Sequence, residues 1–404
     1  MRPLEGVTIV DFTQAFSGPY GTLNLADYGA RVIKIERTGT GDQCRYWLPL
    51  NEEGNSGYFA LYNRNKESLT LDLSREKGRE IVKKLAAKAD IAVDNFKTGT
   101  LDKLGLGYEE LKKINPRIIM ASINGYGQTG SLKHLAAYDN IIEGTCGLMD
   151  CSGFPDGGPN RNGCSIGDSY TGLMAAFAIS MAYYHRLKTG EGQRLEVAMQ
   201  DSLFASLEGA FLEYSINGRK LPRTGNNLSY LASPYDVFEC KDGWFSIAAP
   251  TEAGWQEMCR DMGKLELLDD PRFKTNELRC RHNDELTELL RPFFKERTKE
   301  ELTRCFACRY MGASPVMNAR DTINAPHMAS RNMLMEIDDS YLGRYTTAGH
   351  PMKFEKTPGS IEKGAPKLGE HNVEILKELH YTDSEIKDMI DEEVIDGGGT
   401  ENHA

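Results

Sequence analysis

The sequence has no hydrophobic run long enough to cross a membrane as a helix. Its longest uncharged apolar stretch, Thr171 to Tyr184, is shorter than the roughly 20 residues that a membrane-spanning helix requires. We interpret it as a buried helix. The first residues, MRPLEGVTIVDF, lack the long apolar stretch and cleavage site of a secretory signal and lead directly into a strand pattern. We therefore predict a cytoplasmic protein that does not contact a membrane.

Positive charge is also scarce, since the chain of 404 residues carries a formal net charge of -11. A protein that binds nucleic acid through the phosphate backbone needs a broad basic surface. We therefore expect no nucleic-acid partner. Any phosphate-bearing ligand must be bound by a local group of basic residues instead.

Signatures of disulfides, metals and hydrolytic nucleophiles are missing as well. The nine cysteines are scattered and odd in number, which favours reduced thiols over a disulfide framework. Cys305 and Cys308 form the only close pair, without a second pair or nearby histidines, so we interpret them as packing residues. No HExxH-like site and no GxSxG elbow occurs, and Cys164 has no visible base beside it. We predict no bound metal.

The first half of the chain alternates β-branched runs with helical patterns, which is typical of an α/β fold. Helices are predicted from a Ser74 cap, from about Asp168 to Leu187 and from Met199 to Ile216. The pattern of residues changes at about Leu221. The segment DVFECKDGWFSIAA, which follows, indicates a hairpin that begins a smaller domain. Further predicted features are a helix over 283–294, capping boxes at Thr298/Glu301 and Thr382/Glu385, and a frayed tail GGGTENHA.

One glycine-rich segment raises the possibility of a nicotinamide cofactor. GYGQTG, Gly125 to Gly130, follows the strand run RIIMASI and has the spacing of a dinucleotide-binding loop. A true fingerprint opens a helix directly and occupies the first βα turn of its unit, and this segment does neither. An NAD-dependent oxidoreductase is thus a weak alternative to a structural or substrate-facing loop.

The segment CSIGDSYTG, Cys164 to Gly172, contains one acid, Asp168, at the predicted start of a long apolar helix. The amide groups and the dipole at a helix N-terminus favour a carboxylate. Asp168 is therefore either a helix-capping residue or a catalytic carboxylate, and the local pattern leaves both interpretations open.

Ordered matches along nearly the whole chain decide between them. They are LEGVTIVDFTQAFSGPYGTLNLADYGARVIKIER, NRNKESLTLDL, DNFKTGTLDKLGLG, NPRIIMASINGYGQTG, GDSYTG, KTGEGQRLEVAMQD and LGEHNVEILKEL. In these segments the chain resembles the class III CoA transferases (the CaiB/BaiF family), which include formyl-CoA:oxalate and carnitine CoA-transferases. The aspartate of the family's GDS.TG motif is its nucleophile, and this resemblance assigns that role to Asp168.

The resemblance also implies an architecture. The expected fold is a Rossmann-like α/β large domain formed by both chain ends, a smaller α+β domain and an interlocked homodimer. The expected divisions are a large domain over 1–200, a linker over 201–224, a small domain over 225–320, and a return segment over 321–404 that completes the large domain.

The resemblance further implies that coenzyme A thioesters are substrates and that no cofactor is tightly bound. Arg37, Lys97 and Lys103 supply the local positive charge that phosphates need. The covalent route expected runs through an aspartyl anhydride and an aspartyl-CoA thioester on Asp168. The implied CoA contacts are Gln14, Ala15, Ser17, Arg37, Leu71, Asn95, Phe96, Lys103, Leu104 and Tyr138.

Two departures from the family pattern bear on the substrate. The glycine-rich loop that covers the aspartate in formyl-CoA transferases does not occur, and RTGNNLSYLASP, Arg223 to Pro234, is the candidate replacement. Phe16 occupies a first-loop position that is often polar. The donor acyl-CoA and the acceptor acid therefore stay open.

An alternative in the same superfamily is an α-methylacyl-CoA racemase, in which a histidine precedes an aspartate. Here AAYDN places Tyr138 before Asp139. A tyrosine with a pKa near 10 is a poor general base at neutral pH, which favours the transferase.

Overall fold

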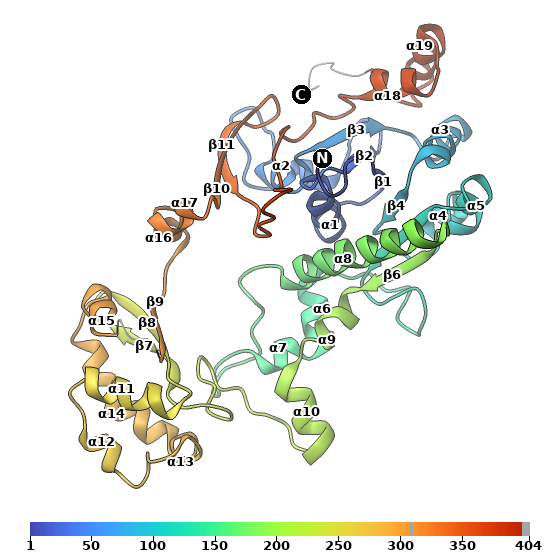
Figure 1. Cartoon of the computed structure of the whole chain (residues 1–404). Helices are drawn as coiled ribbons and strands as arrows, with labels where there is room; N and C mark the ends of the chain where they lie inside the picture. Colours follow the sequence, from blue (N-terminus) through green and yellow to red (C-terminus); the bar gives the residue numbers. More distant parts are fainter. Residues whose placement is uncertain (307–309, 398–404) are drawn as a thin grey trace. The chain divides into compact units, whose positions relative to one another are not determined.

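The computed structural model describes residues 1–306 and 310–397 of the chain (Figure 1). Cys308 of the expected packing pair and residues 398–404 of the expected tail lie outside the described residues. The chain forms two compact units. The large unit comprises 1–148, 162–208 and 329–404, and the small unit comprises 149–161 and 209–328. The domain boundaries expected from the sequence stay a prediction.

A six-stranded parallel sheet forms the centre of the large unit, in the order β3-β2-β1-β4-β5-β6. This confirms the mixed α/β class. The predicted runs VTIVD, RVIKIE, DIAVD, RIIMASI and QRLEVA all contain strands, whereas β3 begins at Lys66 and ends at Thr70, before most of the run LTLDL. The strands are β1 (Thr8–Asp11), β2 (Arg31–Glu36), β3 (Lys66–Thr70), β4 (Ile91–Asp94), β5 (Ile119–Asn124) and β6 (Arg194–Ala198).

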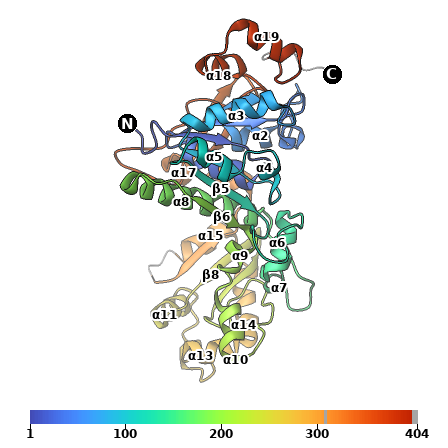
Figure 2. The ribbon, with the colours of Figure 1, turned by 90° about the vertical axis from the view of Figure 1, so that its right-hand side faces the viewer.

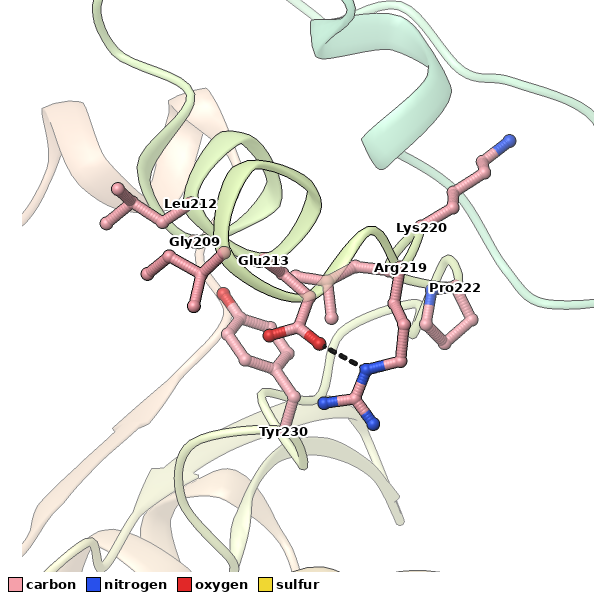
Figure 3. Close-up of a pocket in the computed structure, with 9 residues that line it drawn as sticks. Gly209, Leu212, Glu213, Arg219, Lys220, Pro222 and Tyr230 are labelled. Atoms are coloured by element: carbon pink, nitrogen blue, oxygen red, sulfur yellow. Dashed lines mark ion pairs between the residues drawn. The ribbon is translucent and has the colours of Figure 1, made fainter.

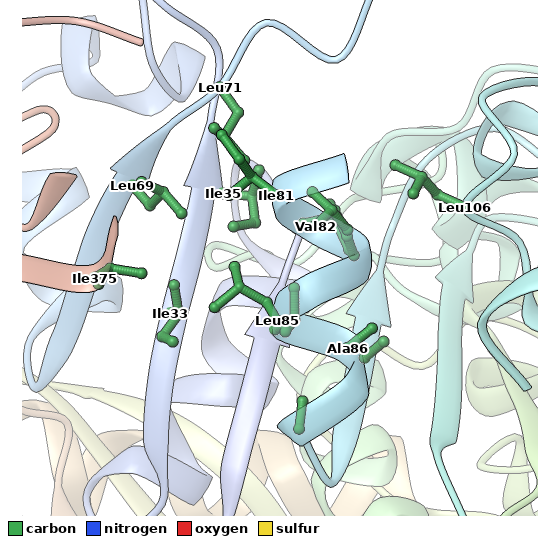
Figure 4. Close-up of a cluster of buried hydrophobic side chains, with 14 of the residues drawn as sticks. Ile33, Ile35, Leu69, Leu71, Ile81, Val82, Leu85, Ala86, Leu106 and Ile375 are labelled. Carbon is green, nitrogen blue, oxygen red and sulfur yellow. The ribbon is translucent and has the colours of Figure 1, made fainter. Parts of the chain in front are cut away.

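Alternating side chains of these strands enter two different cores, because successive residues of a strand point to opposite faces. On one face Val10, Ile33 and Ala92 join a cluster that includes Ile81 and Leu85 of α3, shown in Figure 4. On the other face the neighbouring positions, such as Ile9, Val32 and Ile91, pack with α1 and α8. Figure 2 shows α3 and α8 on opposite sides of the strands. A sheet covered on both faces explains why the strands β1 to β5 are almost continuously buried.

The C-terminal segment contributes to the first of these cores. Ile375 and Leu376 of α18 and Ile386 and Met389 of α19 are buried in the same cluster as the N-terminal strands. The large unit is thus built from both ends of the chain. Its helices are α1 (Ser17–Ala26), the 3-10 helix η1 (Gln43–Tyr46), α2 (Gly57–Asn63), α3 (Glu76–Lys88), α4 (Thr100–Lys103), α5 (Tyr108–Ile114), α6 (Asp139–Cys146), α8 (Ile166–Thr189), α9 (Met199–Phe204), α18 (Asn372–Glu378) and α19 (Asp383–Asp391); β10 (Leu334–Asp339) and β11 (Gly343–Ala348) form a hairpin.

The small unit packs helices against a three-stranded antiparallel sheet. The predicted hairpin is confirmed as β7 (Tyr235–Cys240) and β8 (Gly243–Ala248), and β9 (Gly312–Pro315) joins its open edge. The core is rich in phenylalanine, with Phe238 stacked on Phe294 at a ring-centroid distance of 4.3 Å. The helices are α11 (Glu252–Asp261), α12 (Glu266–Asp269), α13 (Asn276–Arg281), α14 (Asn283–Lys295), α15 (Lys299–Cys305) and α16 (Ala319–Ile323); α7 (Leu148–Cys151), α10 (Glu208–Asn217) and α17 (Pro326–Ser330) span the bounds between units.

Most local helix predictions are confirmed, including the helix over 283–294 and both capping boxes. The Ser74 cap is wrong. Helix α3 begins at Glu76 after Arg75, and the Ser74 hydroxyl donates instead to Asp72 at 2.6 Å. The single helix predicted from Met199 to Ile216 is also wrong, because it breaks into α9 and α10 at Glu208, whose φ is +28°.

In the part of the chain that the structure describes, no helix combines the length and apolarity that a membrane crossing would require. The same part holds no cluster of three or more histidine, cysteine, aspartate or glutamate side chains placed to bind a metal.

Candidate active site

The carboxyl end of the parallel sheet collects most of the residues that the sequence singled out. The chain order reverses between β1 and β4, which are neighbours in the sheet. In open α/β sheets, ligands bind in the crevice outside the carboxyl ends of the strands at such a reversal. The loop after β1 carries Gln14 and Ala15 and leads into Ser17, the first residue of α1, and the loop after β4 carries Asn95 and Phe96.

Two reciprocal hydrogen bonds join these loops across the reversal point. The backbone N–H of Gln14 donates to Asn95 Oδ1 at 2.8 Å, and Asn95 Nδ2 donates to the Gln14 carbonyl at 2.7 Å. The next residue, Ala15, has a φ of +64°, which is uncommon for a residue other than glycine. Its N–H donates to Asp42 Oδ1 at 3.0 Å, so a buried carboxylate holds this conformation.

Charged side chains buried beneath the first loop fix its path. Lys34 forms an ion pair with Asp42 at 2.9 Å, and its Nζ also donates to the Thr13 carbonyl at 2.6 Å. A second buried pair joins Lys66 to Asp11 at 3.2 Å. Burial lowers the pKa of Lys66 to about 8, with Asp11 opposing the shift. The sequence analysis missed this network; a lysine in the apolar run RVIKIE was the signal that could have found it.

Asp168 lies in the first turn of α8, two residues after its first residue, and Ser165 is the N-cap. Ser17, at the start of α1, lies beside the Asp168 carboxylate, and the Ser17 hydroxyl and backbone N–H favour the ionised form and so act to lower the pKa of Asp168. Helices α1 and α8 approach closely at a pair of glycines. A Cβ on Gly172 would lie 2.4 Å from the Ser17 carbonyl oxygen, and one on Gly21 would lie 2.9 Å from the Gly172 carbonyl oxygen. This crossing brings together Ser17 and Asp168, two residues that the sequence analysis named separately.

The environment of Asp168 favours its neutral form. Burial raises the pKa of Asp168 to about 7, with the nearby Asp139 carboxylate adding to the shift and Ser17 opposing it. Asp139 Oδ1 accepts from the Gly167 N–H at 2.8 Å and from the Asp168 N–H at 3.3 Å. A carboxyl with such a shift beside a second acid is typical of functional sites.

Aromatic side chains from α1 and α2 line the surroundings of Asp168. Phe16 stacks on Tyr62 at a ring-centroid distance of 4.2 Å, and Tyr58 meets both rings edge to face. Burial raises the pKa of Tyr58 and of Tyr62 above the ordinary value, and a neighbouring tyrosine and Asp168 add to each shift. The two hydroxyls are therefore neutral hydrogen-bond donors near the carboxylate. Phe16 was noted from the sequence, but the two tyrosines were not.

The other expected CoA contacts differ in accessibility. Arg37, Lys97 and Lys103 are exposed, so their cationic groups are available to phosphates. Phe96 and Leu104 are partly buried against the core, and Leu71 is fully buried within it, so Leu71 offers a ligand only backbone atoms. Tyr138 is 64% exposed and precedes α6 as its N-cap. The structure thus places Gln14, Ala15, Ser17, Asn95 and Phe96 together at the carboxyl end of the sheet. The basic residues Arg37, Lys97 and Lys103 are exposed on the surface.

The small unit contains a separate hollow of about 480 Å³ beside α10 (Figure 3). Glu213 and Arg219 form an ion pair at its rim, with a distance of 2.7 Å. None of the expected CoA contacts lines it. The expected covering loop, residues 223–234, belongs to the same unit, where Arg223 donates to the Gly157 carbonyl at 2.8 Å. Its role as a cover stays a prediction.

Comparisons with known proteins agree in what they indicate. The sequence profile of CoA-transferase family III matches residues 4–372. The chain is 36% identical over 401 residues to a succinyl-CoA:glutarate CoA-transferase of Mus musculus, covering 98% of this chain and 91% of the relative. It is 38% identical over 379 residues to an acetyl-CoA:oxalate CoA-transferase of Acetobacter aceti, covering 93% and 96%.

A solved structure extends the likeness to three dimensions. The crystal structure of a CAIB/BAIF family protein from Brucella suis superimposes with a TM-score of 0.83 at 35% identity, covering 94% of this chain and 99% of that one. The resemblance found in the sequence motifs is confirmed, and the protein is an enzyme that belongs to CoA-transferase family III.

Proposed function

We propose that this enzyme transfers coenzyme A from an acyl-CoA donor to a free carboxylic acid, with Asp168 as the nucleophile. The observation that carries the proposal is the position of the Asp168 carboxylate. It lies beside Ser17, where α1 meets α8, and is partly buried. Ser17 directly follows the loop after β1, at the carboxyl end of the sheet, where ligands bind in open α/β sheets.

The proposed reaction proceeds through two covalent intermediates. A carboxylate oxygen of Asp168 attacks the thioester carbonyl, the C–S bond breaks, and CoA leaves as a thiolate from a mixed anhydride. The thiolate attacks the Asp168 carbonyl carbon, which releases the donor acid and leaves an aspartyl-CoA thioester. The acceptor carboxylate attacks this thioester and displaces the thiolate, and the thiolate then attacks the acyl carbon of the second anhydride. The products are a new acyl-CoA and the original carboxylate.

Binding and water exclusion supply most of the rate in this proposal, because a carboxylate is a weak nucleophile. Holding CoA by its nucleotide keeps the thiolate close to the anhydride, so that transfer precedes hydrolysis. The loops tied by Gln14 and Asn95 are rigid candidates for the pantetheine contact. The exposed Arg37, Lys97 and Lys103 are the candidates for the phosphates.

Dicarboxylic acids are the first acceptors that we propose to test. The two relatives described above are named for glutarate and oxalate, and both acids carry a second carboxylate. The neutral hydroxyls of Tyr58 and Tyr62 near Asp168 are hydrogen-bond donors of the kind that a carboxylate accepts. Succinyl-CoA and acetyl-CoA are the corresponding donors.

A homodimer is part of the proposal. Along the 24 residues of α8, one face is buried against the sheet, while large apolar residues on the outside are exposed. They recur at helical spacing, as in a surface that packs against another protein. These residues are Leu173, Met174, Phe177, Met181, Tyr184 and Leu187. A second copy of the chain is the proposed partner, and its interlocked arrangement and the cytoplasmic location stay predictions.

A matrix of acyl-CoA donors and free acids tests the proposed function. Succinyl-CoA and acetyl-CoA are incubated with glutarate, oxalate, formate, a hydroxy acid and an aromatic acid, and new CoA esters are identified by mass spectrometry. In a second arm, hydroxylamine is added to enzyme and donor without acceptor. We expect a hydroxamate on the peptide that contains Gly167, Asp168 and Ser169. Exchange of the donor's α-proton with deuterated water, without a hydroxamate, would instead indicate racemase chemistry.

A further inference from the structure

Two acidic side chains on α6 lie one helical turn apart, and one of them contacts the backbone of Asp168. Asp139 is in the first turn of α6, and Glu143, four residues later, is 0% exposed. Residues at this spacing are neighbours on one face of a helix. Their side chains hydrogen-bond to each other, and the contact raises the pKa of Asp139 together with burial, which is the larger cause. No sequence pattern singles out Glu143.

A hydrogen bond between two carboxyl groups requires a proton, because an ionised carboxylate can only accept. Neighbouring amide groups donate hydrogen bonds to one oxygen of each carboxyl group. Asp139 Oδ1 accepts from the N–H groups of Gly167 and Asp168, and Glu143 Oε2 accepts from Asn162 N at 2.9 Å and Asn162 Nδ2 at 3.1 Å. Asp139 Oδ2 and Glu143 Oε1 are both buried. Each carboxyl thus binds amide groups through one of its oxygens.

The contact with α8 has the form of a helix cap supplied by another helix. Ser165, the N-cap of α8, makes no capping hydrogen bond with its side chain. The first amide groups of a helix have no partners within it and need an acceptor. Asp139 supplies that acceptor to the second and third residues of α8, and the third is Asp168 itself. Any movement of the Asp139 side chain therefore moves or frees the backbone of the nucleophile.

We propose that Glu143 is a positioning residue for CoA transfer: the proton that it shares with Asp139 locks the carboxyl that caps α8 and so holds Asp168 in place. Asn162 anchors the far side of Glu143. The chain of contacts runs from Asn162 through Glu143 and Asp139 to the backbone of Asp168. This role rests on the proposed function, since it concerns the nucleophile of that reaction.

Two substitutions at one position separate the shared proton from the volume of the side chain. Glu143→Gln retains a donor for Asp139 and an acceptor for Asn162, so we expect kcat to stay close to that of the parent. Glu143→Leu fills the same space without either hydrogen bond. We expect its kcat to fall by about 10- to 100-fold, because a misplacement of ~1 Å can cost 100-fold. The KM for succinyl-CoA should change far less, since Glu143 is buried and is not one of the expected CoA contacts.

The kinetic assay uses the fastest donor and acceptor pair found in the parent matrix, and thermal unfolding verifies that each variant is folded. Asn162→Ala, a change at a less buried residue, serves as a second variant and should lower kcat in the same direction. Equal kcat for Glu143→Leu and the parent would overturn the proposal. Equal losses for Glu143→Gln and Glu143→Leu would also overturn it, because the shared proton would then be irrelevant.

Hydrogen exchange gives a readout that does not depend on activity. The N–H groups of Gly167 and Asp168 should exchange faster in Glu143→Leu than in the parent and in Glu143→Gln, while a peptide from α3 should be unchanged. Unchanged exchange at α8 would contradict the positioning role. If the parent formed no CoA ester and no hydroxamate, the proposed function would fail, and the exchange result would still decide whether Glu143 holds the start of α8.

Discussion

The core of the small unit is built mainly from aromatic and aliphatic side chains, whereas the loop after β1, at the carboxyl edge of the large unit's sheet, rests on buried charges. In the small unit, Phe238, Phe245 and Phe294 pack together. In the large unit, Lys34 and Asp42 form a buried ion pair directly beneath the loop after β1. Buried ion pairs are weak contributors to stability, because the desolvation cost offsets much of the attraction.

This difference indicates what each interior does. An apolar core can reach its stability with many equivalent packings, and it specifies few backbone positions individually. Buried charges impose exact partners: Lys34 binds the Thr13 carbonyl and Asp42 binds the Ala15 N–H. The large unit therefore places costly groups where a loop must hold a defined conformation. The following predictions test that contrast.

The largest effect is expected at Asp168. Asp168→Ala should abolish CoA transfer and the hydroxamate, because no other group in the proposal forms the anhydride. Folding and CoA affinity should be largely retained, since the side chain does not cap its own helix, α8, and Asp168 is not one of the expected CoA contacts. Transfer assays, thermal unfolding and calorimetric titration with CoA measure the three quantities. Transfer at the parent rate would show that Asp168 is not the nucleophile; Asp168→Asn is a weaker test because deamidation restores the acid.

A paired comparison addresses the two interiors directly. Lys34→Met should destabilise the protein by about 3–5 kcal/mol, because it leaves Asp42 as an unpaired buried charge. Phe294→Ala in the small unit should cost a similar ~3–5 kcal/mol through loss of packing. Denaturant unfolding measures both changes.

The same two variants should also differ in their affinity for CoA. At a temperature where both are folded, Lys34→Met should weaken CoA binding because the loop that carries Gln14 and Ala15 loses its support. Phe294→Ala should bind CoA like the parent. If calorimetry shows that both variants lose the same amount of CoA affinity, the difference between the two interiors does not affect ligand binding.

A smaller effect is expected from the exposed cation Arg37. Arg37→Ala should weaken binding of the CoA nucleotide by about 1.5–3 kcal/mol, the range for a charge-assisted hydrogen bond. The free acid should be affected less. Lys295→Ala, at an exposed position of α14, is the matched control and should leave binding unchanged. If Arg37→Ala lost the same affinity for intact CoA and for dephosphorylated CoA, the result would argue against a contact between Arg37 and a phosphate.

The smallest effect is a pH dependence. Burial first, and Asp139 second, raise the pKa of Asp168 to about 7, and the reaction needs its carboxylate form. The value of kcat/KM, which reports the free enzyme, should therefore fall as the pH drops below 7, by about tenfold at pH 6. Asp139→Asn removes the neighbouring charge and should shift this acid limb to lower pH. If Asp139→Asn leaves the fall in kcat/KM at the same pH, or moves it to a higher pH, the result would contradict the assignment of this pKa to Asp168.

Local sequence patterns predicted the elements better than their ends. The apolar runs identified the sheet strands, and the spacing of Thr298 and Glu301 identified a capping box, because strand and cap signals lie within a few residues. Ser74 was a plausible cap that the chain did not use, since Asp72 captures its hydroxyl. The break before Glu208 had no such local signal.

By itself, the sequence determined the α/β class and the family, and it nominated Asp168 as the candidate nucleophile, because motif residues and hydrophobic periods are contiguous. Only the tertiary structure showed that Gly172 lets α8 approach Ser17 and that Asp139 and Glu143 support the backbone of Asp168. Ser17 and Asp168 are far apart along the chain, and a contact between them depends on how two helices cross. Packing and desolvation decide that crossing, and neither can be read from the spacing of residues.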